Sequence, residues 1–103
     1  MNKEAFFKAL KNAPALEETD CADYDSVKVV ARFFAPWHVA SWAITEFDEK
    51  TGLCFGLCDM GMGPELGMVA MDDLLNIEGP HGLRVERDKF FEGTVGDARK
   101  LAS

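Results

Sequence analysis

With 103 residues and a formal charge of −7, the chain is long enough to bury a hydrophobic core, and its charge disfavours binding to nucleic-acid backbones. Apolar residue types make up 48% of the chain, yet no uninterrupted run of them is long enough to span a bilayer. Three cysteines cannot all pair, and the N-terminus lacks a signal-peptide pattern. The sequence therefore predicts one cytoplasmic domain over residues 1–103, without membrane association and without duplex nucleic acid as a partner.

The first predicted elements are a short amphipathic helix and an acidic connection. Phe6 and Leu10 recur at helical spacing within residues 3–12, and Asn2 is available as the N-cap. Residues 13–26 are acidic and irregular, so they are expected to lie on the surface.

A sheet is predicted within residues 27–88 from alternating apolar and polar side chains. Its strands are expected near residues 27–34, 40–48, 53–59 and 65–70, with a fifth near 83–86. Gly52 supplies the positive φ that a hairpin loop needs after the second strand. In that strand, Trp42 and Ile44 are expected on one face and Phe47 on the other.

Two further helical segments are predicted, over residues 71–77 and 94–102. Thr94 and Asp97 have the spacing of a capping box at the start of the second one. Together the elements indicate an α+β fold, an antiparallel β-meander of four to five strands with short flanking helices that cover one face.

A charged cluster is the first candidate site. Its members are Glu46, Asp48, Glu65, Glu86, Arg87 and Asp88. If the sheet brought them together, Arg87 would pair with one carboxylate and lower its pKa, leaving another as a general base or metal ligand. The alternative is a structural clamp, in which Arg87 reaches across the fold to pin the hairpin to the C-terminal segment. The clamp is the favoured interpretation, because arginine–carboxylate pairs are more often structural than catalytic.

An apolar contact surface is the second candidate. Its members are Trp37, Trp42, Met60, Met62 and Met68. Exposed thioethers form an adaptable surface for a partner, whereas core packing is the more frequent use of methionine. The same side chains would also suit an apolar cavity for a small molecule.

No metal site and no cofactor is predicted. Cys54 and Cys58 would stand about 13 Å apart along a strand, too far for a disulfide. His38 and His81 have no spacing that completes a zinc site with these cysteines. The thiols are therefore interpreted as small buried apolar groups.

Several ordered motifs carry a resemblance to a known family. They are Phe34-Ala35-Pro36, Trp42 through Asp48, Phe55-Gly56-Leu57 with Gly61, Pro64-Glu65-Leu66-Gly67, and Leu83 through Asp88. Across residues 33–91 the chain resembles the bacterial family catalogued as domain of unknown function 2958. The family has a serine where Ala70 stands, which implies a helix that lacks its side-chain N-cap here. The resemblance implies a bacterial protein carried on plasmids, integron cassettes or other mobile genetic elements, and it implies no agreed activity.

Three function classes stay open. A non-enzymatic interaction or regulatory protein is favoured, because the sequence contains no recognisable nucleophile elbow or cofactor motif. The alternatives are a small-molecule-binding domain and a carboxylate-based hydrolase or metal-dependent enzyme. The expected partner is a protein or a small molecule, and a homodimer is also open.

Overall fold

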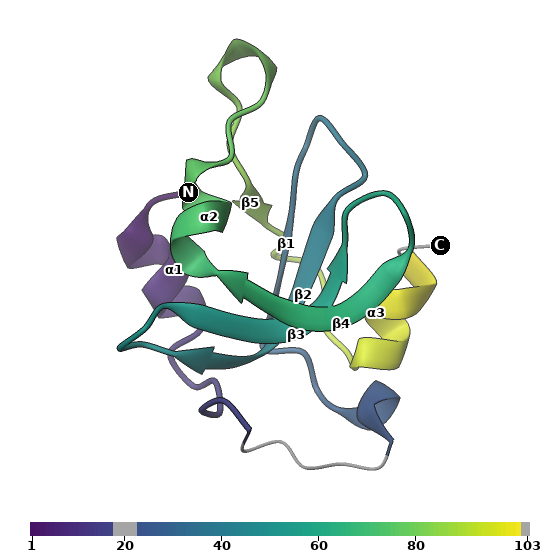
Figure 1. Cartoon of the computed structure of the whole chain (residues 1–103). Coiled ribbons are helices and arrows are strands. Elements are labelled where there is room, and N and C mark those ends of the chain that lie inside the picture. The colour runs from purple at the N-terminus through teal and green to yellow at the C-terminus, as the bar shows by residue number, and fades with distance from the viewer. Residues whose placement is uncertain (18–22, 102–103) are drawn as a thin grey trace.

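The structure, a computed structural model, describes residues 1–17 and 23–101 (Figure 1). Its elements in chain order are α1 (Lys3–Ala9), the 3-10 helix η1 (Tyr24–Ser26), β1 (Ala31–Phe34), β2 (Ser41–Asp48), β3 (Leu53–Asp59), β4 (Pro64–Ala70), α2 (Met71–Asn76), the 3-10 helix η2 (Pro80–Gly82), β5 (Glu86–Arg87) and α3 (Val95–Leu101). The strands form one antiparallel sheet in the order β4-β3-β2-β1-β5. The α+β class and the antiparallel meander are therefore confirmed.

Helix α1 begins where the sequence predicts. The side chain of Asn2 accepts a hydrogen bond from the backbone N–H of Ala5 at 2.8 Å, which satisfies one of the free donors of the first turn. The regular helix ends at Ala9, three residues before the predicted boundary, but the buried positions Phe6 and Leu10 are those expected. No helix among the described residues is long and apolar enough to cross a membrane.

The central strand β2 contains a bulge. The pairing of β2 with β3 shifts between Ile44 and Glu46, so Thr45 is an extra residue in the ladder. One extra residue reverses the alternation of side chains, and Phe47 returns to the face that carries Trp42. The expectation that Phe47 lies on the opposite face is therefore wrong.

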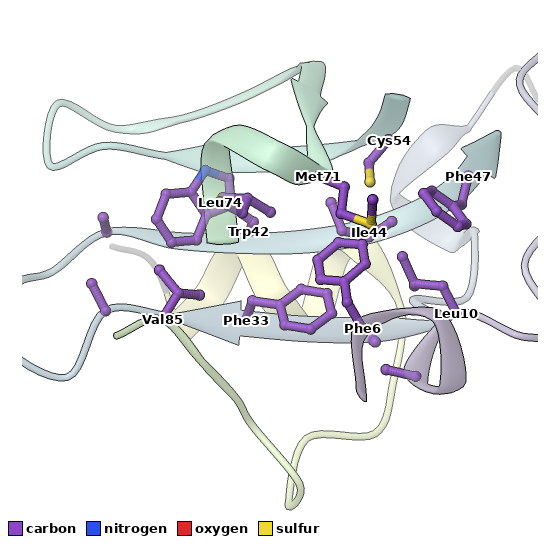
Figure 2. Packing of buried hydrophobic residues seen from close by; sticks show 14 residues of the cluster. Phe6, Leu10, Phe33, Trp42, Ile44, Phe47, Cys54, Met71, Leu74 and Val85 are labelled. Atoms are coloured by element: carbon purple, nitrogen blue, oxygen red, sulfur yellow. The ribbon is translucent and has the colours of Figure 1, made fainter. Parts of the chain in front are cut away.

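The larger core lies between one face of the sheet and helices α1 and α2 (Figure 2). The rings of Phe6 and Phe33 stack with their centroids 4.8 Å apart, and Phe47 meets Phe6 edge-on at 5.8 Å. Met71 and Leu74 of α2 close the other side of the same cluster. Aromatic side chains from α1, β1 and β2 thus join the helical layer to the sheet.

Helix α3 packs on the other face of the sheet, so the expected cover on one face alone is wrong. Val95 and Ala98 of α3 form a smaller core with Ala43 and Leu57. The reason is a local pairing before the helix: Thr94 bridges Lys28, and this carries the chain to the second face. The predicted capping box forms there, since Thr94 and Asp97 exchange backbone and side-chain hydrogen bonds of 2.9 and 3.3 Å.

The first and last strands in chain order, β1 and β5, differ most from the predicted ones. Residues 27–30 precede β1 and are held by one isolated bridge and single hydrogen bonds rather than forming a strand. Arg84 pairs with Glu78 in an excursion at the top of Figure 1, so β5 begins only at Glu86. Gly79 lies against the ring of Trp37 at the base of this excursion.

Gly56 is expected to be essential for the β2–β3 pairing. A Cβ on Gly56 would lie 2.0 Å from the carbonyl oxygen of Ala43, whereas a Cβ on its cross-strand neighbour Gly67 would meet nothing within 4 Å. We expect Gly56→Ala to lower the free energy of unfolding by about 1–3 kcal/mol, because backbone must move. Gly67→Ala should change it by less than about 0.5 kcal/mol. Urea unfolding of both variants measures this difference, and equal midpoints would contradict the close approach.

Candidate functional site

The residues of the predicted charged cluster do not meet. Glu46 and Asp48 lie at the C-terminal end of β2. The segment Glu86–Asp88 lies beside the C-terminal end of β1, which pairs with the beginning of β2. Glu65 is on β4, at the far side of the sheet. Within residues 1–17 and 23–101, no three His, Cys, Asp or Glu side chains are grouped as metal ligands.

Glu46 is buried and holds the acidic connection against the sheet. Its Oε1 accepts a hydrogen bond of 2.9 Å from the backbone N–H of Glu17. The next residue, Phe47, donates its N–H to the carbonyl of Pro14 at 2.9 Å. Both contacts tie the chain after α1 to β2, so Glu46 has a structural role.

The bulge residue Thr45 forms the second attachment of the same region. Its hydroxyl donates to the carbonyl of Phe55 at 3.1 Å and also hydrogen-bonds the phenol of Tyr24. The ring of Tyr24 meets Phe55 edge-on at 5.7 Å. Burial raises the pKa of Tyr24 above its ordinary value, and the hydrogen bond with Thr45 opposes part of that rise. The arrangement fixes η1 on the sheet.

Asp48 closes the β2–β3 hairpin. Its Oδ1 accepts a hydrogen bond of 2.9 Å from the backbone N–H of Lys50, and this bond lowers the pKa of the Asp48 carboxyl. The Asp48 carboxylate therefore stabilises the hairpin turn.

The structure contains an arginine–carboxylate clamp, but its arginine is Arg32 rather than Arg87. Arg32 Nη1 lies 3.0 Å from Asp88 Oδ2, and the two side chains are 15% and 22% exposed. The backbone N–H of Asp88 also donates to the carbonyl of Arg32 at 2.8 Å. Arg87 is exposed, and none of the ion pairs found among the described residues includes it. The pairing of the chain segments brings Arg32 to Asp88. The sequence alone does not indicate this partner, because the two residues are far apart in the chain.

A cavity with a mixed polar and apolar lining adjoins this clamp. It encloses about 420 Å³ and is lined by Arg32, Ser41 and Asp59 together with Val39, Leu101 and the β3–β4 loop. Ser41 and Asp59 are buried and face each other across β2 and β3. Asp59 Oδ1 accepts a hydrogen bond of 2.8 Å from the backbone N–H of Gly61. The cavity is of a size to take a small polar molecule. None of its lining residues belongs to the predicted charged cluster, although one of them, Arg32, pairs with the cluster member Asp88.

The predicted apolar surface separates into two groups. Trp42 is in the core, and Trp37 is half-buried against Gly79. The methionines are exposed, as is Leu66, which the sequence analysis did not single out. The exposed set is Met60, Met62, Leu66 and Met68. Leu66 and Met68 are two residues apart on β4 and therefore share a face of the strand. This spacing is visible in the sequence and could have identified Leu66 as a member of the surface.

Cys54 and Cys58 are free thiols; Cys54 is buried in the larger core, and Cys58 is partly buried against it. Burial raises the pKa of Cys54 to about 12 and that of Cys58 to about 11. The thiolate is the reactive form, so neither residue is suited to nucleophilic or redox chemistry near neutral pH.

Replacing Arg32 is expected to destabilise the fold, whereas replacing Arg87 is not. We expect Arg32→Ala to lower the free energy of unfolding by about 1.5–3 kcal/mol, because Asp88 loses a charge-assisted hydrogen bond at a partly buried position. Arg87→Ala removes the same side chain from an exposed position and should change it by less than about 0.5 kcal/mol. Thermal and urea unfolding compare the two variants. A larger loss for Arg87→Ala would restore Arg87 as the clamp.

The two cysteines are expected to resist alkylation until the chain unfolds. A Cys21→Ser background removes the third thiol, which lies outside the described residues. At pH about 8, iodoacetamide should label the folded protein at least about a hundredfold more slowly than the urea-unfolded chain, as read by mass spectrometry. The raised pKa values also imply that the stability contributed by the two protonated thiols is fully present below the unfolded thiol pKa of about 8.5. This contribution is lost as pH rises through the pKa values of the folded thiols. Rapid labelling of folded Cys54 would show that its thiol is accessible and ionised.

Comparison with known proteins identifies the family. Residues 2–98 match the family described as "Protein of unknown function (DUF2958)". No curated protein and no solved structure matches the chain. The match includes the motifs within residues 33–91 and extends beyond them on both sides. The chain therefore belongs to the DUF2958 family, whose function is unknown.

Proposed function

We propose that this is a non-enzymatic interaction protein, which binds an extended segment of a protein partner along the free edge of β4. The carrying observation is the position of β4 at one end of the sheet, where its seven residues pair with β3 and with no other strand of residues 1–17 and 23–101. An edge of this length offers backbone donors and acceptors to an added strand.

The opposite edge of the sheet provides the comparison. β5 has two residues, Glu86 and Arg87, and charged residues follow it directly. Short edge strands and edge charges are the usual protection against unwanted strand pairing. β4 has a single charged residue, Glu65, and its pairing with β3 is regular throughout. The fold thus protects one edge and leaves the other open.

Exposed apolar side chains accompany the open edge. Leu66 and Met68 project from β4, and Met60 and Met62 lie in the loop between β3 and β4. Flexible thioethers adapt to different partner side chains at low cost. An added strand would bury alternate apolar side chains against Leu66 and Met68 while its backbone pairs with the edge.

Charge around β4 selects the chemistry of the partner. Glu65 is exposed on β4, Asp72 and Asp73 are exposed on α2 directly after it, and no Lys or Arg occurs between residues 51 and 83. A partner segment that carries Lys or Arg beside its apolar residues is therefore favoured. A second copy of this chain would bring the same acids into opposition and is disfavoured.

We propose that the protein acts in the cytoplasm of a bacterium, as a regulatory protein encoded by a mobile genetic element. The free thiols Cys54 and Cys58 support a reducing compartment. The family resemblance supports the bacterial origin.

Selection from a library of displayed extended peptides tests the proposal. We expect the selected peptides to alternate apolar residues and to carry flanking Lys or Arg. Leu66→Lys and Met68→Lys place charges on the edge and should weaken their binding by about tenfold or more, as measured by calorimetry. Leu83→Lys is the matched control, because Leu83 is 40% exposed and Leu66 41%; it should leave binding unchanged.

Two results would overturn the proposal. Peptides that bind the β4 variants as tightly as the parent would place the binding surface elsewhere. A parent that sediments as a dimer, and becomes monomeric on Leu66→Lys, would make the second copy the occupant of the edge. Unchanged unfolding midpoints establish that the variants are folded in either case.

A further inference from the structure

A basic groove lies at the other edge of the sheet, between α1 and β5. It consists of two adjoining hollows of about 520 and 470 Å³, which share Lys8, Ala9 and Arg87. The cations of this basic groove are Lys8, Lys11, Lys28, Arg87 and Lys89. They come from α1 and the turn after it, from the segment before β1 and from the region of β5, so the fold assembles them from three separate parts of the chain.

The charge of the basic groove is opposite to that of the chain. Five of the eleven Lys and Arg residues line it, against one of the eighteen Asp and Glu residues, Glu86. All five cations are exposed, and none takes part in the ion pairs found among the described residues. Five clustered cations with one acid among them repel one another, and an anionic ligand relieves that repulsion.

The shape and lining of the basic groove distinguish between classes of anion. Its cations are spread over both hollows instead of converging on one point, which suits an extended ligand with several charges better than a single phosphate. Four of the five are lysines, which act as flexible point charges. No aromatic side chain lines either hollow, so the stacking platform that single-stranded nucleic acids use is missing from the described lining.

The remaining surface limits the length of the ligand. Six Lys and Arg residues and seventeen Asp and Glu residues lie outside the basic groove. A long polyanion such as duplex DNA would leave the basic groove and run over acidic surface, where it is repelled within a Debye length of about 8 Å. A short acidic stretch is free of this cost.

We propose that the basic groove binds a short, extended acidic segment of a protein. Its carboxylates pair with Lys8, Lys28 and Arg87, while its backbone passes over the small apolar floor that Ala9 and Val29 provide. The site is independent of the β4 edge, since β4 and β5 are the two ends of the sheet.

Fluorescence anisotropy with a labelled decaglutamate peptide tests this inference. We expect binding that weakens markedly between about 50 and about 200 mM NaCl, because the contacts are exposed ion pairs. The double variant Lys8→Gln, Arg87→Gln should weaken binding by about tenfold. The double variant Lys3→Gln, Lys50→Gln changes the net charge equally outside the basic groove and should leave the affinity within about twofold of the parent.

Two other anions serve as competitors. A deca-thymidylate oligonucleotide and inorganic pyrophosphate should each displace the peptide only at much higher concentration, and a DNA duplex should not displace it. Tighter binding of the oligonucleotide would assign the basic groove to nucleic acid, and equal binding of pyrophosphate would assign it to a small phosphate. Equal loss in the two double variants would show a response to net charge alone. Each of these three results overturns the proposal.

Discussion

The pairing of β2 with β3 through a bulge at Thr45 is the constraint on which the rest of the structure depends. It brings Phe47 to the face of Phe6 and Phe33, where aromatic packing joins α1 to the sheet. On the other side, Thr45 and Glu46 hold η1 and the chain after α1. Without the extra residue, strand alternation would move Phe47 out of the core, and a core aromatic contributes about 3–5 kcal/mol.

The sequence predicted the elements well where local signals decide them, and poorly where a distant residue decides. Turn residues delimit β3 and the hairpin at Gly52, and their boundaries were predicted correctly. A bulge leaves no mark in a single sequence, because Thr45 suits a regular strand as well as an irregular one. The face covered by α3 depends on the bridge between Lys28 and Thr94, which joins residues far apart in the chain.

The candidate site shows the same division. The sequence left two uses open for Met60, Met62 and Met68, with core packing the more frequent one, and all three side chains are exposed in the structure. The charged residues could not be assigned from the sequence either, because a carboxylate next to an arginine in the chain need not be its partner in the fold. Asp88 pairs with Arg32, 56 residues away, while the adjacent Arg87 belongs to the basic groove. Asp88 follows β5 directly, and the hydrogen bond from its backbone N–H to the carbonyl of Arg32 places it beside that arginine, whereas Arg87 lies within β5 and lines the basic groove.

The two ends of the sheet carry opposite chemistry, and this asymmetry argues for recognition rather than catalysis. A hydrolytic site needs an acid and a base that converge on one reacting atom. Here Glu46 is engaged with a backbone N–H inside the fold, Asp48 with a turn, and Asp88 with Arg32. At the two ends of the sheet, the described part of the chain leaves an apolar strand edge in an acidic surface and a basic groove. An apolar edge and a set of unpaired charges both gain free energy from a partner that covers them, and neither requires a substrate to be transformed.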